Sequence, residues 1–189
     1  MKPLRADAQR NRDKLIETAR EAFRERGSAA SLDDIAKRAG VGPGTLYRHF
    51  PTRDDLIDAV MRDWADRVEA DAQTVIDAGR PPRETLTTWF TRFLDNVGIY
   101  HGAATKVMSA MDDPASPIYR KCQVLAEANR RVLESDAVRS GVREGVDPRQ
   151  VMRLVSGISV AVDQAGLAPE QAEPMLRIVL DGVLRPDAD

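Results

Sequence analysis

Cysteine and histidine are scarce in this chain of 189 residues. The single cysteine, Cys122, rules out a disulfide within the chain and fits a reducing compartment. With only two histidines, His49 and His101, the chain has too few ligands for a zinc site built from histidine and cysteine. We therefore expect no metal site and no cofactor.

Long apolar runs are also missing. No stretch approaches the roughly eighteen apolar residues of a membrane span, and the charged N-terminus has no apolar signal core. These absences predict a cytoplasmic protein with no membrane partner.

Charge is distributed unevenly along the chain. Residues 1–53 carry twelve Lys and Arg against seven Asp and Glu, a net charge of +5. Residues 54–189 carry sixteen against twenty-three, a net charge of −7. This asymmetry predicts a polyanionic partner for the first part only, although chance clustering on a solvated surface would give the same count.

Helical periodicity marks the N-terminal third. A helix is predicted over residues 8–26, and a short helix follows Ser31, where the S-x-x-D spacing is typical of a side-chain cap. Pro43 fits the first position of a third helix, and Thr52 with Asp55 predicts the cap of a fourth. The expected apolar face of the first helix consists of Leu15, Ile16, Ala19, Ala22 and Phe23.

Alternating glycines in Gly40-Val41-Gly42-Pro43-Gly44 resemble a phosphate-binding loop at first sight. That interpretation needs a preceding strand and a closing Lys-Ser/Thr, and the sequence has neither. Two short helices joined by a glycine turn instead predict a helix-turn-helix, whose second helix can lie in the DNA major groove. Gly44 would let the backbone approach DNA closely, or would serve a tight helix–helix contact.

The second helix of this unit carries side chains suited to DNA. Thr45 can contact a thymine methyl or a base edge, and Arg48 can bind guanine with two hydrogen bonds. The polar tips of Tyr47 and His49 suit phosphate oxygens. Lys37 and Arg38 are either backbone contacts or part of a solvated face. A disordered basic arm near the minor groove is predicted from Lys2, Arg5, Arg10 and Arg12.

Residues 12–58 resemble the DNA-binding domain of TetR-type transcriptional regulators. The resemblance rests on S-L-D-D-I-A-K-R-A-G-V-G, T-L-Y-R-H-F and T-R-D-D-L. It implies a DNA-binding domain over 1–53 and an effector-binding and dimerisation domain over 54–189. The DNA-contact positions that it implies are Ser31, Thr45, Tyr47, His49 and Arg53, with Pro43 and Gly44 at variable positions that help to select the sequence. Pro51 departs from the lysine or other polar residue that family members often carry, which removes one phosphate contact.

The rest of the chain predicts further helices. A long helix from Arg53 to about Ala78 would connect the N-terminal part to the body. No alternating strand pattern appears, so we expect an all-α fold of about nine helices. The remaining helices are expected from Leu86 to about Tyr100, over 103–111, from Pro117 to about Ser135, over 148–164 and over 169–184.

The resemblance also implies a homodimer. Two copies of the last two helices would form a four-helix interface across a two-fold axis, or their apolar stripes would fill each subunit's own core. The stripes are Val151, Leu154, Val155, Ile158 and Val162, and Met175, Leu176, Val179, Leu180 and Val183.

A small-molecule effector in the body is a further implication. The candidates for its pocket combine apolar bulk with a few polar tips, although an aromatic stripe at helical spacing is more often plain core. They are Trp89, Phe93, Val97, Tyr100, His101, Met108, Met111, Tyr119, Cys122 and Leu125.

These features predict a sequence-specific transcriptional regulator, a repressor that a small molecule releases from a palindromic operator. An enzyme is not expected, because Cys122 and His101 lie in no nucleophile signature and no third orienting residue is identifiable. The alternative is a helical adaptor that binds protein through its aromatic face, which would leave the basic N-terminal part unexplained.

Overall fold

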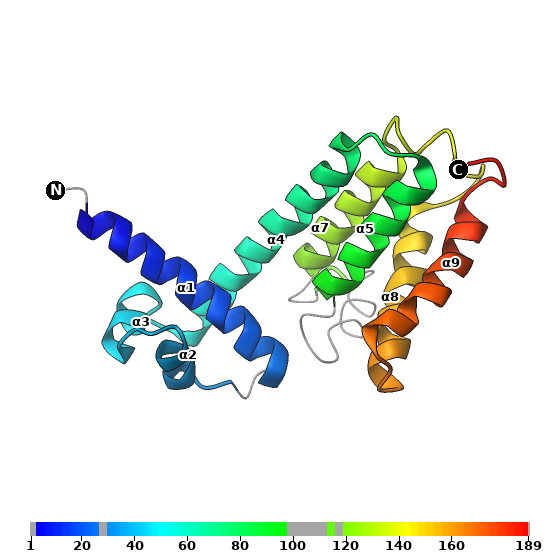
Figure 1. Ribbon diagram of the computed structural model, residues 1–189. Helices are drawn as coiled ribbons and strands as arrows, with labels where there is room; N and C mark the ends of the chain where they lie inside the picture. The colour runs from blue at the N-terminus through cyan, green and yellow to red at the C-terminus, as the bar shows by residue number, and fades with distance from the viewer. Residues whose placement is uncertain (1–2, 27–29, 98–112, 116–118, 189) are drawn as a thin grey trace. The chain divides into compact units, whose positions relative to one another are not determined.

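The computed structural model describes residues 3–26, 30–97, 113–115 and 119–188, and its regular elements in these ranges are helices. They are α1 (Pro3–Arg26), α2 (Leu32–Arg38), α3 (Pro43–His49), α4 (Arg53–Asp77), α5 (Pro82–Val97), α7 (Tyr119–Leu133), α8 (Pro148–Gln164), the 3-10 turn η2 (Pro169–Gln171) and α9 (Ala172–Val183) (Figure 1). The all-α prediction is confirmed. The helix predicted over 103–111 lies outside the described residues.

The chain forms two compact units, which divide within α4 between Trp64 and Ala65. None of the helices in the described ranges is long and apolar enough to cross a membrane. The functional division predicted at residues 53 and 54 stays a prediction.

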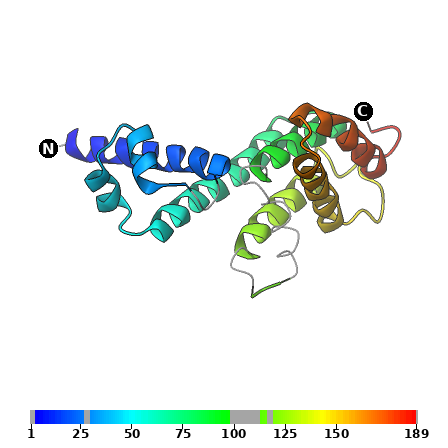
Figure 2. The same cartoon turned by 90° about the horizontal axis from the view of Figure 1, so that it is seen from below.

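The N-terminal unit has one core, made by α1, α2, α3 and the start of α4 (Figure 2). The predicted apolar face of α1 is buried. Helices α2 and α3 have seven residues each, too short for an isolated helix to be stable in water. Tertiary packing therefore holds them, through Ile35 and Ala36 of α2 and Leu46 of α3.

The turn between α2 and α3 depends on Gly40. Its φ of +70° lies in the left-handed region that favours glycine. The Gly40 N–H donates to the Lys37 carbonyl at 3.1 Å, and the Val41 N–H donates to the Ala36 carbonyl at 3.0 Å, which closes the C-terminus of α2. Pro43 then occupies the first turn of α3, so the predicted helix-turn-helix is confirmed.

Two predictions about the N-terminal unit are wrong. Helix α1 begins at Pro3, so Arg5, Arg10 and Arg12 lie in a helix rather than in a disordered arm; Lys2 lies outside the described residues. Side-chain pairs three and four residues apart, such as Arg10 with Asp7, support this extension.

The side-chain cap predicted at Ser31 is also absent. Ser31 is the N-cap residue of α2, but its hydroxyl makes no capping hydrogen bond. Asp34, the partner expected from the S-x-x-D spacing, instead accepts a hydrogen bond from Arg26 Nη1 at 2.9 Å.

The predicted cap of α4 is confirmed. Thr52 Oγ1 accepts a hydrogen bond from the Asp55 N–H at 3.1 Å, and Asp55 Oδ2 accepts one from the Thr52 N–H at 2.9 Å. This reciprocal arrangement is a capping box. The hydrogen bonds from the Thr52 hydroxyl and N–H hold the pKa of the Asp55 carboxyl below its ordinary value.

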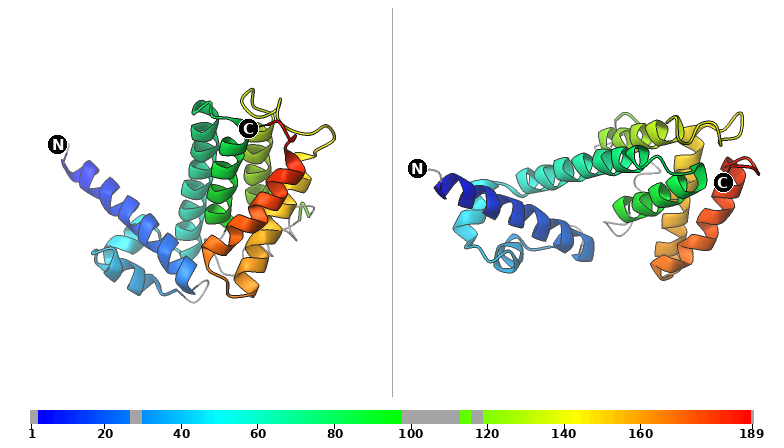
Figure 3. Two further views of the ribbon diagram at one scale, coloured as in Figure 1. Left: turned by 45° about the vertical axis from the view of Figure 1, so that its right-hand side comes forward. Right: turned by 45° about the horizontal axis from the view of Figure 1, so that its top comes forward.

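The body packs α5, α7, α8 and α9 around a second core, in which α8 and α9 form a hairpin (Figure 3). Trp89 of α5 donates from Nε1 to Asn129 Oδ1 of α7 at 3.0 Å, and Asn129 Nδ2 donates to the Pro148 carbonyl at 2.7 Å. Asp147 caps α8 by accepting a hydrogen bond from the Arg149 N–H at 2.8 Å, and Pro148 begins the helix, as predicted. Pro169 begins a 3-10 turn rather than the last α-helix, which starts at Ala172.

Replacing the cap residue tests the start of α4. Thr52→Ala is expected to lower the free energy of unfolding by about 1 kcal/mol at neutral pH. Because the folded pKa of Asp55 is depressed, the bonds to its carboxylate contribute above its unfolded pKa and are lost as the pH falls through its folded pKa. The difference between variant and wild type in urea unfolding should therefore shrink in acid.

Thr87→Ala is the matched control, because the Thr87 hydroxyl donates to the Arg83 carbonyl of its own helix and meets no carboxylate there. A Thr52→Ala effect of the same size at both pH values would contradict the capping box.

Candidate nucleic-acid interface

Helix α3 has one buried and one exposed side. Leu46 and the following Phe50 are buried at 0% and 2% exposure, which fixes the direction in which the other side chains point. Tyr47 is 47% exposed. The remaining predicted contacts on this helix are either fully exposed or half-buried: Pro43, Gly44 and Arg48 are exposed, and Thr45 and His49 are half-buried. The structure thus brings all six together on one short helix.

The stretch around α3 has basic side chains and no acidic ones. Between Gly40 and Arg53 the sequence has no carboxylate, and the last turn of α3 contains Arg48 and His49. Among the described residues Arg48 has no ion-pair partner, so its guanidinium is available to an outside acceptor. A basic, carboxylate-free helix face is what a phosphate backbone attracts.

Packing does not require glycine at Gly42, the N-cap residue of α3, or at Gly44 inside the helix. A Cβ built on either would meet nothing within 4 Å, and neither has a positive φ. This open space removes the tight helix–helix contact as an explanation of Gly44. A side chain is missing at Gly44 although packing within the chain would allow one. Its absence suits the close approach of another molecule to the helix backbone.

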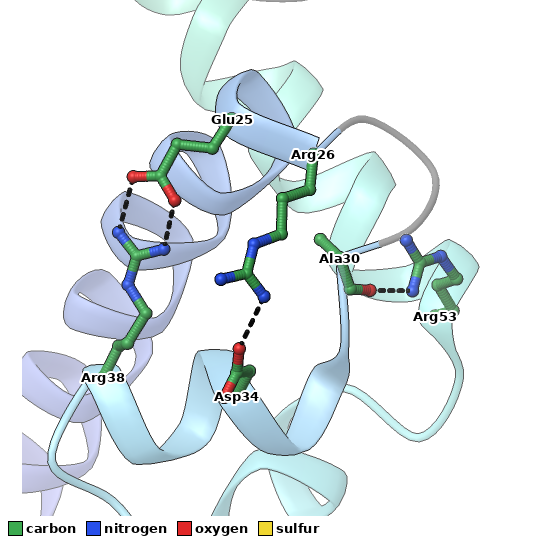
Figure 4. Close-up of polar contacts among 6 residues, drawn as sticks. All are labelled: Glu25, Arg26, Ala30, Asp34, Arg38 and Arg53. Carbon is green, nitrogen blue, oxygen red and sulfur yellow. Dashed lines mark hydrogen bonds and ion pairs between the residues drawn. The ribbon is translucent and has the colours of Figure 1, made fainter.

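Arg53, a predicted DNA contact, also has a structural role. Its Nη1 donates to the Ala30 carbonyl at 2.7 Å (Figure 4). Its guanidinium carbon also lies 5.2 Å from the centre of the Phe23 ring. Arg53 therefore ties the start of α4 to the segment before α2 and to α1. Spacing along the chain does not predict either contact, because Ala30 and Phe23 are far from Arg53 in the sequence.

Arg38 is engaged with α1. Its Nη1 and Nη2 donate to Glu25 Oε2 and Oε1 at 2.8 and 3.0 Å (Figure 4). These hydrogen bonds hold the pKa of the Glu25 carboxyl below its ordinary value. Of the two open candidates on α2, Arg38 is thus paired, and Lys37 is exposed.

Arg12 and Ser31 flank the same unit. The Arg12 guanidinium carbon lies 5.5 Å from the centre of the Phe50 ring, directly after α3. Sequence reasoning placed Arg12 in an arm and missed this stacking, because the two residues are far apart in the chain. Ser31 is exposed at the N-terminus of α2.

The pocket candidates in the body divide into two groups. Trp89, Phe93, Cys122 and Leu125 are buried, and Trp89 and Phe93 stack edge to face with their ring centres 6.1 Å apart. Tyr119 is half-buried. The other candidates lie outside the residues or side chains that the structure describes: Val97, Tyr100, His101, Met108 and Met111. Within the described ranges no three His, Cys, Asp or Glu side chains gather to hold a metal ion.

The stripes on the last two helices mostly fill the subunit's own core, which is the alternative left open above. The buried members are Val151, Val155, Ile158, Leu176, Leu180 and Val183. Leu154 is 58% exposed, and Ile178, which the stripes did not include, is 74% exposed. Spacing of three and four residues finds an apolar face but cannot say whether the chain itself covers it.

Comparison with known proteins assigns the fold to a family. Residues 15–60 match the model "Bacterial regulatory proteins, tetR family", and residues 81–186 match "Transcriptional regulator SbtR-like, C-terminal domain". The chain belongs to the TetR family of transcriptional regulators. The helix-turn-helix described above lies inside the first match.

Two solved structures and a curated relative match this chain over most of its length. The TetR transcriptional regulator SCO0520 from Streptomyces coelicolor is 33% identical, with 94% of this chain and 99% of that chain covered and a TM-score of 0.72. A TetR regulator from Mycobacterium vanbaalenii is 29% identical, with 97% and 100% covered and a TM-score of 0.70. The transcriptional repressor KstR2 of Mycolicibacterium smegmatis is 28% identical over 192 residues, which cover 94% of this chain and 93% of KstR2.

The chain is therefore a DNA-binding transcriptional regulator, and the adaptor alternative is set aside. The relatives named here are regulators rather than enzymes.

Gly44 provides a direct test of the interface. Gly44→Ala is expected to stabilise α3, by up to about 1 kcal/mol, because alanine has the higher helix propensity and its Cβ meets open space. The same Cβ should weaken DNA binding, because it would stand between the helix backbone and the groove. Thermal unfolding and DNA titration of one preparation measure both effects. A more stable variant with undiminished DNA affinity would show that DNA does not approach this position.

Proposed function

We propose that the chain is a homodimeric repressor that binds a palindromic operator through α3 of each subunit and is released by a small-molecule effector. The observation that carries this proposal is the exposed face of α3, which combines a carboxylate-free surface, the unpaired Arg48 and the bare Gly44. Its site of action would be chromosomal DNA in the cytoplasm.

Each residue of the interface has a chemical role in this proposal. Arg48 and Thr45 read base edges, and Tyr47 and His49 contact phosphate oxygens. Pro43 and Gly44 let the helix N-terminus enter the groove. Ser31 presents the N-terminus of α2 to a phosphate. To Arg53 we assign, besides the phosphate contact that the family resemblance implies, the task of holding α2 and α4 together through Ala30.

Dimerisation would use the outer side of α8 and α9. Leu154 and Ile178 are large, apolar and exposed, and Val162 and Val179 on the same helices are half-buried. Water contact with such side chains is unfavourable, and a two-fold axis would pair each patch with its own copy. Two-fold symmetry in the protein would then match two-fold symmetry in the operator.

Release by an effector requires a connection from the body to the DNA-binding unit. Helix α4 is one continuous helix that contributes to both compact units. In the body, Asp71 of α4 accepts from Arg92 Nη1 at 2.8 Å and from Asn96 Nδ2 at 3.1 Å, both on α5. A ligand that displaces α5 would move α4 through these bonds and change the spacing of the two α3 helices, which must be about 34–36 Å for half-sites one turn apart.

The effector must bind the DNA-incompetent state more tightly than the competent state, or the equilibrium does not shift. Two relatives are consistent with small-molecule control: KstR2 of Mycobacterium tuberculosis is described as a ketosteroid transcriptional regulator, and LfrR of Mycobacterium smegmatis was solved in complex with proflavine. We extend this kind of control, though neither ligand itself, to the present chain.

Removal of the unpaired arginine tests base readout. With an operator selected from random duplex DNA, Arg48→Ala is expected to cost about 1–3 kcal/mol in binding and to relax the preference at one base pair of each half-site. Arg139→Ala, which removes an exposed arginine of the body, is the control and should leave the affinity unchanged. Equal losses on operator and on random DNA would show that Arg48 contacts only phosphate.

A charge on the outer face tests the dimer. Leu154→Asp combined with Ile178→Asp is expected to shift the protein from dimer to monomer in sedimentation and to abolish tight operator binding, because a buried interfacial carboxylate has no partner there. Thr87→Asp, on the exposed side of α5, should remain dimeric. A double variant that stays dimeric would place the interface elsewhere.

A further inference from the structure

Ser156 stands out among the buried polar side chains of the body. It is 0% exposed, and its hydroxyl oxygen has no hydrogen-bond partner. In the described part of the body, the other two fully buried polar side chains are satisfied: Thr85 donates to the Arg80 carbonyl at 3.0 Å, and Asn129 bridges Trp89 and Pro148. A serine inside a helix commonly donates to a carbonyl one turn back, and Ser156 does not. Buried hydroxyls are nearly always hydrogen-bonded, so the hydroxyl of Ser156 is a candidate to bond a molecule from outside the chain.

The position of Ser156 along the bundle follows from the hydrogen bonds of Asn129. These bonds put Trp89 of α5, Asn129 of α7 and Pro148 of α8 at one level. From that level, α5 and α8 run in the same direction and α7 in the opposite one (Figure 1). Ser156 lies eight residues beyond Pro148, about 12 Å along the helix.

The same distance along the neighbouring helices reaches the pocket candidates. On α7, eight residues back from Asn129 lead to the residue next to Cys122. On α5, eight residues on from Trp89 lead past Phe93 to the end of the helix. Helices α5, α7 and α8 all contact one another. Ser156 thus belongs to the same end of the body as Phe93, Cys122 and Leu125, which are all buried.

The chemistry of this end restricts what it can bind. None of the fully buried side chains described in the body carries a charge, and the partly exposed charges beside Phe93 are already paired, Arg92 with Asp71 at 2.8 Å. Burial of a charged ligand group among the buried side chains would be costly, whereas an apolar molecule gains from the burial. One polar group on that molecule could pair with the orphan hydroxyl.

We propose that Ser156 is the polar anchor of the effector site, and that the effector is a neutral, mainly apolar molecule with a carbonyl or ether oxygen that accepts a hydrogen bond from Ser156 Oγ. This inference rests on the proposed function, because it supplies the chemical class of the effector. Sequence reasoning did not single out Ser156, since its position in α8 does not disclose whether its hydroxyl has a partner.

Nile red, a neutral apolar dye with one carbonyl, is the probe. Full-length wild type should bind it with enhanced fluorescence. Ser156→Ala should weaken dye binding about fivefold to tenfold, the loss expected for one hydrogen bond. The emission of the bound dye should move to shorter wavelength, because its carbonyl loses a donor. The urea midpoint of the free protein should stay or rise, because an unsatisfied buried hydroxyl is removed.

Thr85→Val is the matched control, since it removes a buried hydroxyl that is already paired. It should lower the urea midpoint and leave dye affinity and emission unchanged. Equal affinity and emission for wild type and Ser156→Ala would overturn the proposal, and so would a wild type that does not bind the dye.

Operator titration of the same samples separates this inference from the proposed function. Ser156-dependent dye binding that leaves operator affinity unchanged would refute release by an effector and support the Ser156 site. If the wild type binds the dye through Ser156 but binds no operator, only the DNA-binding role of α3 is refuted, and the Ser156 site is supported.

Discussion

Burial of Leu46 and Phe50 is the constraint on which the DNA-binding unit depends. A helix of seven residues does not persist by itself in water, so α3 exists because these two side chains are removed from solvent against α1, α2 and α4. Their burial also determines which residues face outward. Because Leu46 and Phe50 are buried, Tyr47 and Arg48 are exposed, and Thr45 and His49 are half-buried between the two sides. Arg12, stacked on the Phe50 ring, extends that hold to α1.

Both units connect their helices through arginines at the surface, and the body adds buried polar contacts. In the N-terminal unit, arginines connect helices at the surface: Arg53 reaches Ala30, and Arg38 pairs with Glu25. Such contacts orient the helices and contribute little individually to stability. In the body the decisive polar contacts are buried, where Asn129 links three helices. Against that satisfied background, the unpaired hydroxyl of Ser156 is the exception. A ligand-controlled regulator needs a rigid body, which the satisfied contacts supply, and a binding site with a free polar group, which we assign to Ser156.

Local signals in the sequence predicted much of the fold. Proline and capping residues correctly predicted the start of α3 at Pro43, the cap of α4 by Thr52 with Asp55, and the start of α8 at Pro148, because these signals act within a few residues. The apolar face of α1 was equally accessible, since its period is local. The cap at Ser31 was wrong: its hydroxyl makes no capping hydrogen bond, and spacing could not foresee that the Asp34 carboxylate pairs with Arg26, eight residues from it in the chain. The roles of Arg53 and Arg12 were missed for the same reason: rings and carbonyls brought near by folding are invisible to spacing.

The functional site likewise has features that could be predicted from the sequence and features that only the structure shows. The residues of α3 could be named from their chemistry and the family resemblance, but only the open space around Gly44 shows that the chain itself does not require glycine there. On α8, spacing grouped the exposed Leu154 with the buried Val151 and Val155, and could not tell a core from an interface.

Selection of binding sites from random duplex DNA, followed by titration of the best sequence at several salt concentrations, tests the central claim most directly. We expect a palindrome whose half-sites are centred about one helical turn apart, with an affinity that falls steeply as salt rises. A folded protein that enriches no sequence, or one that selects a single half-site without two-fold symmetry, would contradict it.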